Sequence, residues 1–191
     1  MFQADAALVE RRQVGRDLFV LGFGAPQVAE AALPGQFVNL LLRPGPLLRR
    51  PFSVYRASEG RVEVLLRSVG VGTAQLLSLA EGDRVSLLGP LGTGFRLDPA
   101  WRSVALVSGG LGVAPFPITA LAARAAGLEV SWVHGARSAA DLCSEWEGDH
   151  AGWATDDGSR GYHGSAVAAV PTEKTGTANW AYISSLSLIH I

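Results

Sequence analysis

The chain contains one cysteine, Cys143, among its 191 residues, and this scarcity limits the chemistry it can carry. A single thiol excludes an internal disulfide framework and any metal or iron–sulfur site built from several cysteines of this sequence. The four histidines show no metal-ligand spacing, so we predict no metal site. Such cysteine usage is typical of proteins of the reducing cytoplasm.

The sequence also lacks basic clusters and long apolar runs. Its 16 Lys and Arg residues nearly balance its 17 Asp and Glu residues, which argues against nucleic acid as a partner. No apolar run approaches the roughly 20 residues that span a bilayer. Residues 1–5 do not begin a signal peptide. We therefore expect a cytoplasmic globular protein of one large or two small domains.

Residues 1–98 alternate short β-like segments with turns such as Pro34-Gly35 and Ser58-Glu59-Gly60. One helix is predicted over residues 73–80. Six antiparallel strands and one helix predict a small closed barrel. The predicted strands are residues 7–10, 17–21, 36–40, 51–55, 61–67 and 85–88.

Residues 99–171 have the pattern of a parallel α/β domain. Residues 104–107 are continuously apolar, as expected for a parallel strand that is covered on both faces. The order βαβαβα is half of a doubly wound nucleotide-binding domain, with the domain boundary near residues 97–101. Two more strands are predicted over residues 128–133 and 151–155, and three helices over 116–126, after Ser138, and more weakly over 164–170.

Residues 172–191 follow neither periodicity. A doubly wound sheet of three strands is also incomplete, because further strands normally cover its edge. We therefore expect a C-terminally truncated chain whose residues 172–191 are a disordered or non-native tail.

Two motifs in the first half suit a flavin dinucleotide. Arg50 can offer a fork of donors to phosphate, and Ser53 can reach the ring edge from the same strand, with Pro51 fixing the backbone between them. Gly72 and Thr73 open a helix, whose first N–H groups can bind an anion. Taken singly, these motifs also fit an ordinary edge strand and a plain helix N-cap. Their occurrence in one barrel-like half favours binding.

A glycine-rich turn in the second half suits a pyridine nucleotide. Gly109, Gly110 and Gly112 follow the first parallel strand, and Pro115 starts the helix after it. Proline replaces the last glycine of the usual Gly-x-Gly-x-x-Gly pattern, so a tight strand–helix turn is the alternative. Arg137, after the second strand, is a candidate for the adenosine ribose or a 2′-phosphate, and equally fits a solvated loop. Asp156-Asp157 suggests metal binding or acid–base work, and a solvated turn explains it as well.

Together these motifs resemble the ferredoxin–NADP⁺ reductase superfamily. Within it, the strings at residues 48–53, 109–115 and 154–159 most resemble the electron-transfer subunits of class 1B dihydroorotate dehydrogenases. The resemblance covers roughly residues 5–170. Carried over by position, it assigns FAD to Arg50, Pro51, Phe52, Ser53, Leu65, Leu66, Arg67, Gly72 and Thr73.

The resemblance implies an antiparallel FAD-binding barrel followed by an incomplete doubly wound NAD-binding domain. It implies a hetero-oligomeric subunit that passes electrons from a partner dehydrogenase, which oxidises dihydroorotate in pyrimidine biosynthesis, to NAD⁺. The family's [2Fe-2S] cluster binds four C-terminal cysteines, which this chain lacks. No residue is an evident acid, base or nucleophile toward dihydroorotate. The alternatives are a reductase subunit of the sulfide dehydrogenase or NADH-dependent ferredoxin reductase type, or a cofactor-free binding module.

Overall fold

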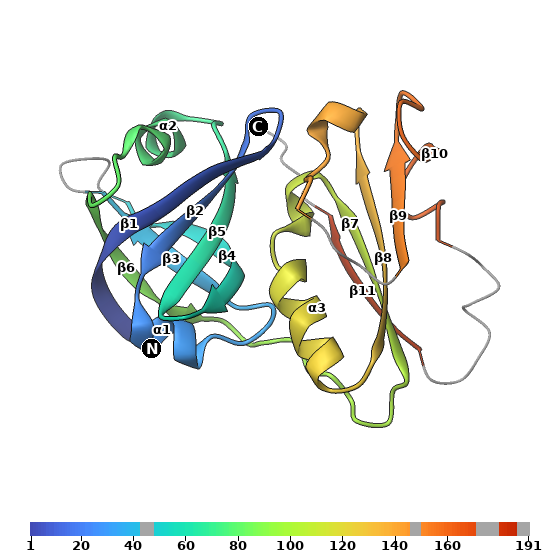
Figure 1. Cartoon of the computed structure of the whole chain (residues 1–191), viewed down its shortest axis with the longest axis horizontal. Coiled ribbons are helices and arrows are strands. Elements are labelled where there is room, and N and C mark those ends of the chain that lie inside the picture. The colour runs from blue at the N-terminus through green and yellow to red at the C-terminus, as the bar shows by residue number, and fades with distance from the viewer. Residues whose placement is uncertain (43–47, 146–149, 171–179, 187–191) are drawn as a thin grey trace. The chain divides into compact units, whose positions relative to one another are not determined.

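The computed structural model divides the chain into two compact units, Met1–Phe95 and Arg96–Ile191 (Figure 1). Among the described residues, no helix combines the length and apolar character that crossing a membrane requires. The structure describes residues 1–42, 48–145, 150–170 and 180–186.

The first unit is a closed antiparallel barrel with the strand order β1-β2-β5-β4-β3-β6, which confirms the predicted architecture. Alternate apolar side chains point inward, and residues such as Val20, Val38, Val54 and Val64 are completely buried. The strands are β1 (Phe2–Gly15), β2 (Leu18–Gly24), β3 (Phe37–Leu41), β4 (Arg50–Ser58), β5 (Arg61–Arg67) and β6 (Arg84–Leu91).

Two helices lie at opposite ends of this barrel (Figure 1). The predicted helix is confirmed as α2 (Val71–Ser78), which directly follows β5. The other helix, α1 (Pro26–Ala31), was not predicted. Its signal in the sequence is Pro26 at the first turn, ahead of the buried Val28 and Ala29. With only six residues, α1 is too short to show a helical period.

The second unit holds a five-stranded sheet in the order β10-β9-β8-β7-β11, in which all strand pairs are parallel. The three predicted strands are present, and two further short strands were not predicted. The strands are β7 (Ser103–Gly109), β8 (Glu129–Ala136), β9 (His150–Thr155), β10 (Tyr162–His163) and β11 (Trp180–Leu186).

Strand β11 corrects the expectation that residues 172–191 form no regular element. It pairs in parallel with β7 from Trp180 opposite Ser103 to Leu186 opposite Gly109. The free backbone edge of β7 accounts for this pairing, since an edge strand offers a row of unpaired N–H and C=O groups. The other positions of the predicted tail, 172–179 and 187–191, lie outside the described residues.

Only one of the three helices predicted for the second unit forms in full, as α3 (Phe116–Ala125). After Ser138 there is a single 3₁₀ turn, η2 (Ala139–Asp141), because the Ser138 hydroxyl donates to the Asp141 carboxylate (2.8 Å) and does not cap the backbone. The helix predicted over 164–170 is wrong. That segment makes isolated turns and starts at Gly164, whose φ of +135° is not helical.

The two faces of the sheet are covered differently. Leu106 and Trp132 are register partners on one face, where the Trp132 ring meets Phe116 of α3 edge-on with 6.0 Å between ring centroids. On the other face, Val107 and its neighbours on β8 and β9 pack against Ala166. The turns of residues 165–170 therefore take the place of the second covering helix of a doubly wound fold.

Candidate functional site

The residues predicted to bind FAD gather at one end of the barrel. Strands β4 and β5 are antiparallel, with Val54 opposite Val64, so the start of β4 lies beside the end of β5. Helix α2 begins shortly after β5 and stays at the same end. This arrangement brings together Arg50, Pro51, Phe52, Ser53, Leu65, Leu66, Arg67, Gly72 and Thr73.

Arg50 lies directly against the first turn of α2. A Cβ atom on Gly72 would stand 2.3 Å from both Cζ and Nε of Arg50, so only glycine leaves room for the guanidinium in this position. Arg50 is half-buried as a residue, and its Nη1 donates to the Leu48 carbonyl at 3.0 Å. The two predicted anion-binding devices, the arginine and the helix N-terminus, are therefore in contact.

Thr73 stabilises this turn through its side chain. Its hydroxyl oxygen accepts the N–H groups of Val69 (3.0 Å) and Gly70 (3.1 Å), and the hydroxyl donates to the Gly70 carbonyl (3.0 Å). The first N–H groups of a helix have no acceptor within it and lie at the positive end of its dipole. With the hydroxyl used in the turn, Thr73 offers a ligand its backbone N–H.

Two arginines at this end differ from the ion-paired arginines of the barrel. Arg12 and Arg61 both bind the buried Glu63 carboxylate, at 2.6 and 3.1 Å. Within the described part of the chain, neither Arg50 nor Arg67 has a carboxylate partner. The Arg67 Nε is also buried without any hydrogen-bond partner. Because leaving a buried donor unsatisfied costs about 1–3 kcal/mol, this end of the barrel fits an anionic ligand that accepts hydrogen bonds.

The remaining predicted flavin residues fall into two groups. Phe52 and Ser53 are half-buried and Pro51 is exposed, so their side chains can reach a ligand. Leu65 and Leu66 are only 4% and 2% exposed and pack in the core. Any contact that these leucines make with a cofactor therefore uses their backbone.

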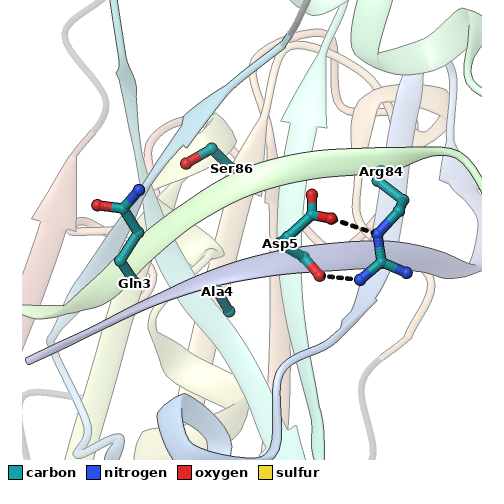
Figure 2. A pocket seen from close by; sticks show the side chains of 5 residues that line it. All are labelled: Gln3, Ala4, Asp5, Arg84 and Ser86. Carbon is teal, nitrogen blue, oxygen red and sulfur yellow. Dashed lines mark hydrogen bonds and ion pairs between the residues drawn. The ribbon is translucent and has the colours of Figure 1, made fainter.

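A polar depression elsewhere on the barrel contains none of these residues. It lies on β1 and β6, where the Arg84 Nε donates to the Asp5 carboxylate at 2.6 Å and an Nη donates to the Asp5 carbonyl (Figure 2). The charge of the one arginine in its lining is thus already balanced. Its lining residues are Gln3, Ala4, Asp5, Arg84 and Ser86.

The residues predicted to bind a pyridine nucleotide lie at the carboxyl end of the parallel strands. Gly109 ends β7, and Gly110 and Gly112 belong to the 3₁₀ turn η1 (Gly110–Val113). Gly110 has a φ of +53°, and a Cβ there would meet open space. Pro115 directly precedes α3, and Arg137 is exposed just after β8. In the sheet register Gly109 is opposite Gly135, which places the ends of β7 and β8 at one edge.

A buried polar network that the sequence analysis missed lies next to this edge. The Ser108 Oγ is 2.9 Å from the His134 Nδ1 and accepts the Trp132 indole N–H at 3.0 Å. The His134 Nε2 accepts the Cys143 backbone N–H at 3.3 Å. Burial lowers the pKa of His134 from 6.5 to about 4, so the ring is neutral at physiological pH. The available signal was a polar residue before glycine at the end of each apolar strand, Ser108-Gly109 and His134-Gly135.

The Asp156-Asp157 segment forms a polar turn. The Asp157 carboxylate accepts the hydroxyl and the backbone N–H of Ser159, which lowers the pKa of this exposed carboxyl. The Thr155 hydroxyl closes the turn by donating to the Arg160 carbonyl at 3.0 Å. In the described part of the chain, no three His, Cys, Asp or Glu side chains group as metal ligands. These contacts favour a structural turn over acid–base or metal chemistry.

Comparison with known proteins identifies the barrel as a FAD-binding domain. The family model described as the oxidoreductase FAD-binding domain matches residues 5–95. The chain is 37% identical over 172 residues to the dihydroorotate dehydrogenase B (NAD(+)) electron transfer subunit of Desulforamulus reducens, covering 84% of this chain and 64% of that protein. It is 34% identical over 174 residues to the subunit of the same name from Listeria monocytogenes serotype 4b, covering 86% of this chain and 67% of that protein.

Two solved structures have a similar fold. The NADH-dependent reduced ferredoxin–NADP oxidoreductase superposes with a TM-score of 0.84 at 28% identity, covering 96% of this chain and 68% of that chain. Phthalate dioxygenase reductase gives a TM-score of 0.70 at 21% identity, covering 95% of this chain and 60% of that chain, which shows likeness of fold alone. With curated relatives above 30% identity across both of its units, the chain belongs to the FAD-binding, ferredoxin reductase-like family that includes the electron transfer subunits of dihydroorotate dehydrogenase B.

Proposed function

We propose that this chain holds FAD in its barrel and a pyridine nucleotide at the carboxyl edge of its parallel sheet, and that it passes electrons between a dihydroorotate-oxidising partner subunit and NAD⁺. The chain spans 64–67% of the length of the two curated relatives, and their shared name supports the substrate and the partner. The observation that carries the proposal is the Arg50 guanidinium lying on Gly72 at the start of α2.

The barrel residues fit the diphosphate and the ring of FAD. Arg50 and the first N–H groups of α2 would bind the diphosphate, where charge-assisted hydrogen bonds are strongest. The unsatisfied Arg67 Nε would donate to the same ligand. Ser53, on the strand that begins with Arg50, would hold the polar edge of the ring. When bound, the flavin supplies the chemistry that links paired hydride transfer to single-electron transfer.

The second unit would orient the pyridine nucleotide through its backbone. Gly109, Gly110 and Gly112 leave room for close approach to the turn, and Pro115 fixes the start of α3 behind it. Arg137 would bind the adenosine end from the end of β8. Which of NADH and NADPH is preferred then depends on how Arg137 meets the ribose. A [2Fe-2S] cluster of the family's type would need four thiolates, which the single buried Cys143 does not supply.

The direct test is reconstitution of the purified chain with FAD, followed by anaerobic addition of NADH. We expect a bound-flavin absorbance spectrum that NADH bleaches. The oxidised partner subunit and oxidised ferredoxin are then offered in separate experiments as electron acceptors. The acceptor that reoxidises the reduced flavin shows whether the chain is a dihydroorotate dehydrogenase subunit or a ferredoxin reductase. A chain that binds no flavin would overturn the proposal and favour a binding module.

Gly112→Val tests the assignment of the two nucleotides to the two units. Gly112 is buried in η1, so the branched side chain should narrow the approach to the turn. We expect the KM for NADH to rise about tenfold or more, the equivalent of losing about 1.4 kcal/mol of binding. The FAD content measured by absorbance should not change. A variant that loses FAD and retains a normal Kd for NADH would show that the two sites are reversed.

A further inference from the structure

The backbone segment that follows β8 is tied to the protein interior at several points. Leu142 and Cys143 are 3% and 1% exposed although they lie outside any strand. The Ala139 N–H donates to the Ser159 hydroxyl at 2.8 Å, and Ser138 bonds Asp141 within the segment. These contacts leave Arg137 exposed at the start of a segment that is otherwise fixed.

His134 makes the contact that anchors the far end of this segment. A buried backbone N–H needs an acceptor, and the Cys143 N–H finds it in the His134 Nε2. Since Nε2 accepts, the ring proton is on Nδ1 and points at the Ser108 Oγ. The Cys143 N–H can only donate, so it fixes the tautomer, and the Ser108 Oγ accepts from both Nδ1 and the Trp132 indole.

Strand register explains why this network reaches the edge of the sheet. Ser108 is opposite His134, and His134 is opposite Trp153, so one row of side chains crosses β7, β8 and β9. The rings of His134 and Trp153 meet edge-on at 6.2 Å. The row stands one residue before Gly109, the last residue of β7, and Gly135, the last but one of β8. An apolar residue would fill the same space without the cost of burying polar atoms. The presence of the imidazole therefore indicates that its Nε2 is needed as the acceptor for the Cys143 N–H.

We propose that His134 is a positioning residue for the pyridine nucleotide. With the Cys143 N–H on its Nε2 and the Ser108 hydroxyl beside its Nδ1, it fixes the Cys143 backbone and, through it, the segment from Arg137 to Cys143 that would receive the adenosine end. This inference rests on the proposed function for the location of the nucleotide. The imidazole is only 1% exposed and acts through the backbone that it holds, so its effect falls on nucleotide affinity.

The test measures binding of ADP-ribose, which carries the adenosine end without nicotinamide, by titration calorimetry on the full chain. His134→Phe retains the aromatic packing and loses both hydrogen bonds, so we expect the Kd for ADP-ribose to rise about tenfold. His134→Gln places an amide oxygen at the position of Nε2 and should recover a Kd within about threefold of the wild-type value. Ser131→Ala is the matched control, because this buried β8 hydroxyl has no hydrogen-bond partner and its loss should leave the Kd unchanged.

Kinetics distinguish positioning from general damage. For His134→Phe we expect a higher KM for NADH, a rate of flavin reduction at saturating NADH within about twofold of wild type, and an unchanged FAD content. An unchanged Kd in His134→Phe, no recovery in His134→Gln, or a lower saturating rate at unchanged KM would each overturn the inference. If the wild-type protein binds ADP-ribose but not FAD, the proposed function is contradicted. The positioning role is still supported in that case if the two His134 variants change the Kd for ADP-ribose as expected.

Discussion

Gly72→Ala is expected to weaken FAD binding as much as Arg50→Ala does, by about 10- to 100-fold, although alanine adds only a methyl group. The added Cβ would stand 2.3 Å from the guanidinium, which is the flexible end of its side chain and can swing away. The charge-assisted contact with the diphosphate would be lost with it. The barrel should remain folded, because alanine favours a helix over glycine by about 1 kcal/mol. FAD titration followed by flavin fluorescence measures the effect.

A double variant that combines Arg50→Ala with Gly72→Ala tests whether the two substitutions act through the same contact. If Gly72→Ala acts by displacing Arg50, the combined variant should bind FAD no more weakly than Arg50→Ala alone. A further loss in the double variant would mean that the methyl group blocks the cofactor directly. Gly70→Ala is the control in the same turn, since its Cβ meets nothing within 4 Å and its φ of −179° suits any residue. Wild-type affinity in Gly72→Ala would remove the Arg50–Gly72 contact from the site.

The barrel was accessible to sequence analysis because its strands carry local signals. Alternating apolar residues, the turn at Gly60 and the helix after Gly70 each fix a neighbouring element. Strand β11 carries no such local signal, and its pairing depends on the edge of β7, which is far away in the sequence. The helix predicted over 164–170 failed for a related reason. The packing of Ala166 against Gly135, where a Cβ would come within 2.9 Å, holds that segment close to the sheet as turns.

In the candidate site, too, some features are marked by the local sequence and others depend on contacts that only the fold creates. The sequence marks Arg50 and Gly72 as suited to an anion, but only the fold brings the two into contact. The role of Thr73 within its turn needs only local geometry, but the plain N-cap alternative is wrong, because the N-cap is Gly70 and Thr73 is the third helical residue. His134 stands in an apolar run without metal-ligand spacing, and its one local signal is a polar residue placed before glycine at the end of a strand. Strand register brings Ser108 next to His134, and the segment that follows β8 folds back to bring Cys143 to the same ring.

Acidification from pH 6.5 to pH 4 is expected to lower the free energy of unfolding of the second unit through His134. Burial lowers the pKa of this imidazole from 6.5 to about 4, so between these values the unfolded chain binds a proton that the folded chain does not. The stabilisation is therefore fully present above pH 6.5 and is lost as the pH falls to about 4. At about 1.4 kcal/mol for each pH unit, the loss is on the order of 3 kcal/mol.

Urea unfolding at several pH values, followed by tryptophan fluorescence, measures this loss. All five tryptophans lie from Trp101 onward, so the signal reports the second unit. His134→Phe is the matched control, because it retains the other titrating groups and should have a shallower dependence between pH 6.5 and 4. Asp157 should add little in this range, since the hydrogen bonds from Ser159 lower its pKa below 3.8. Parallel curves for the wild-type and variant proteins would mean that the folded state admits the protonated imidazole, with Cys143 released from Nε2.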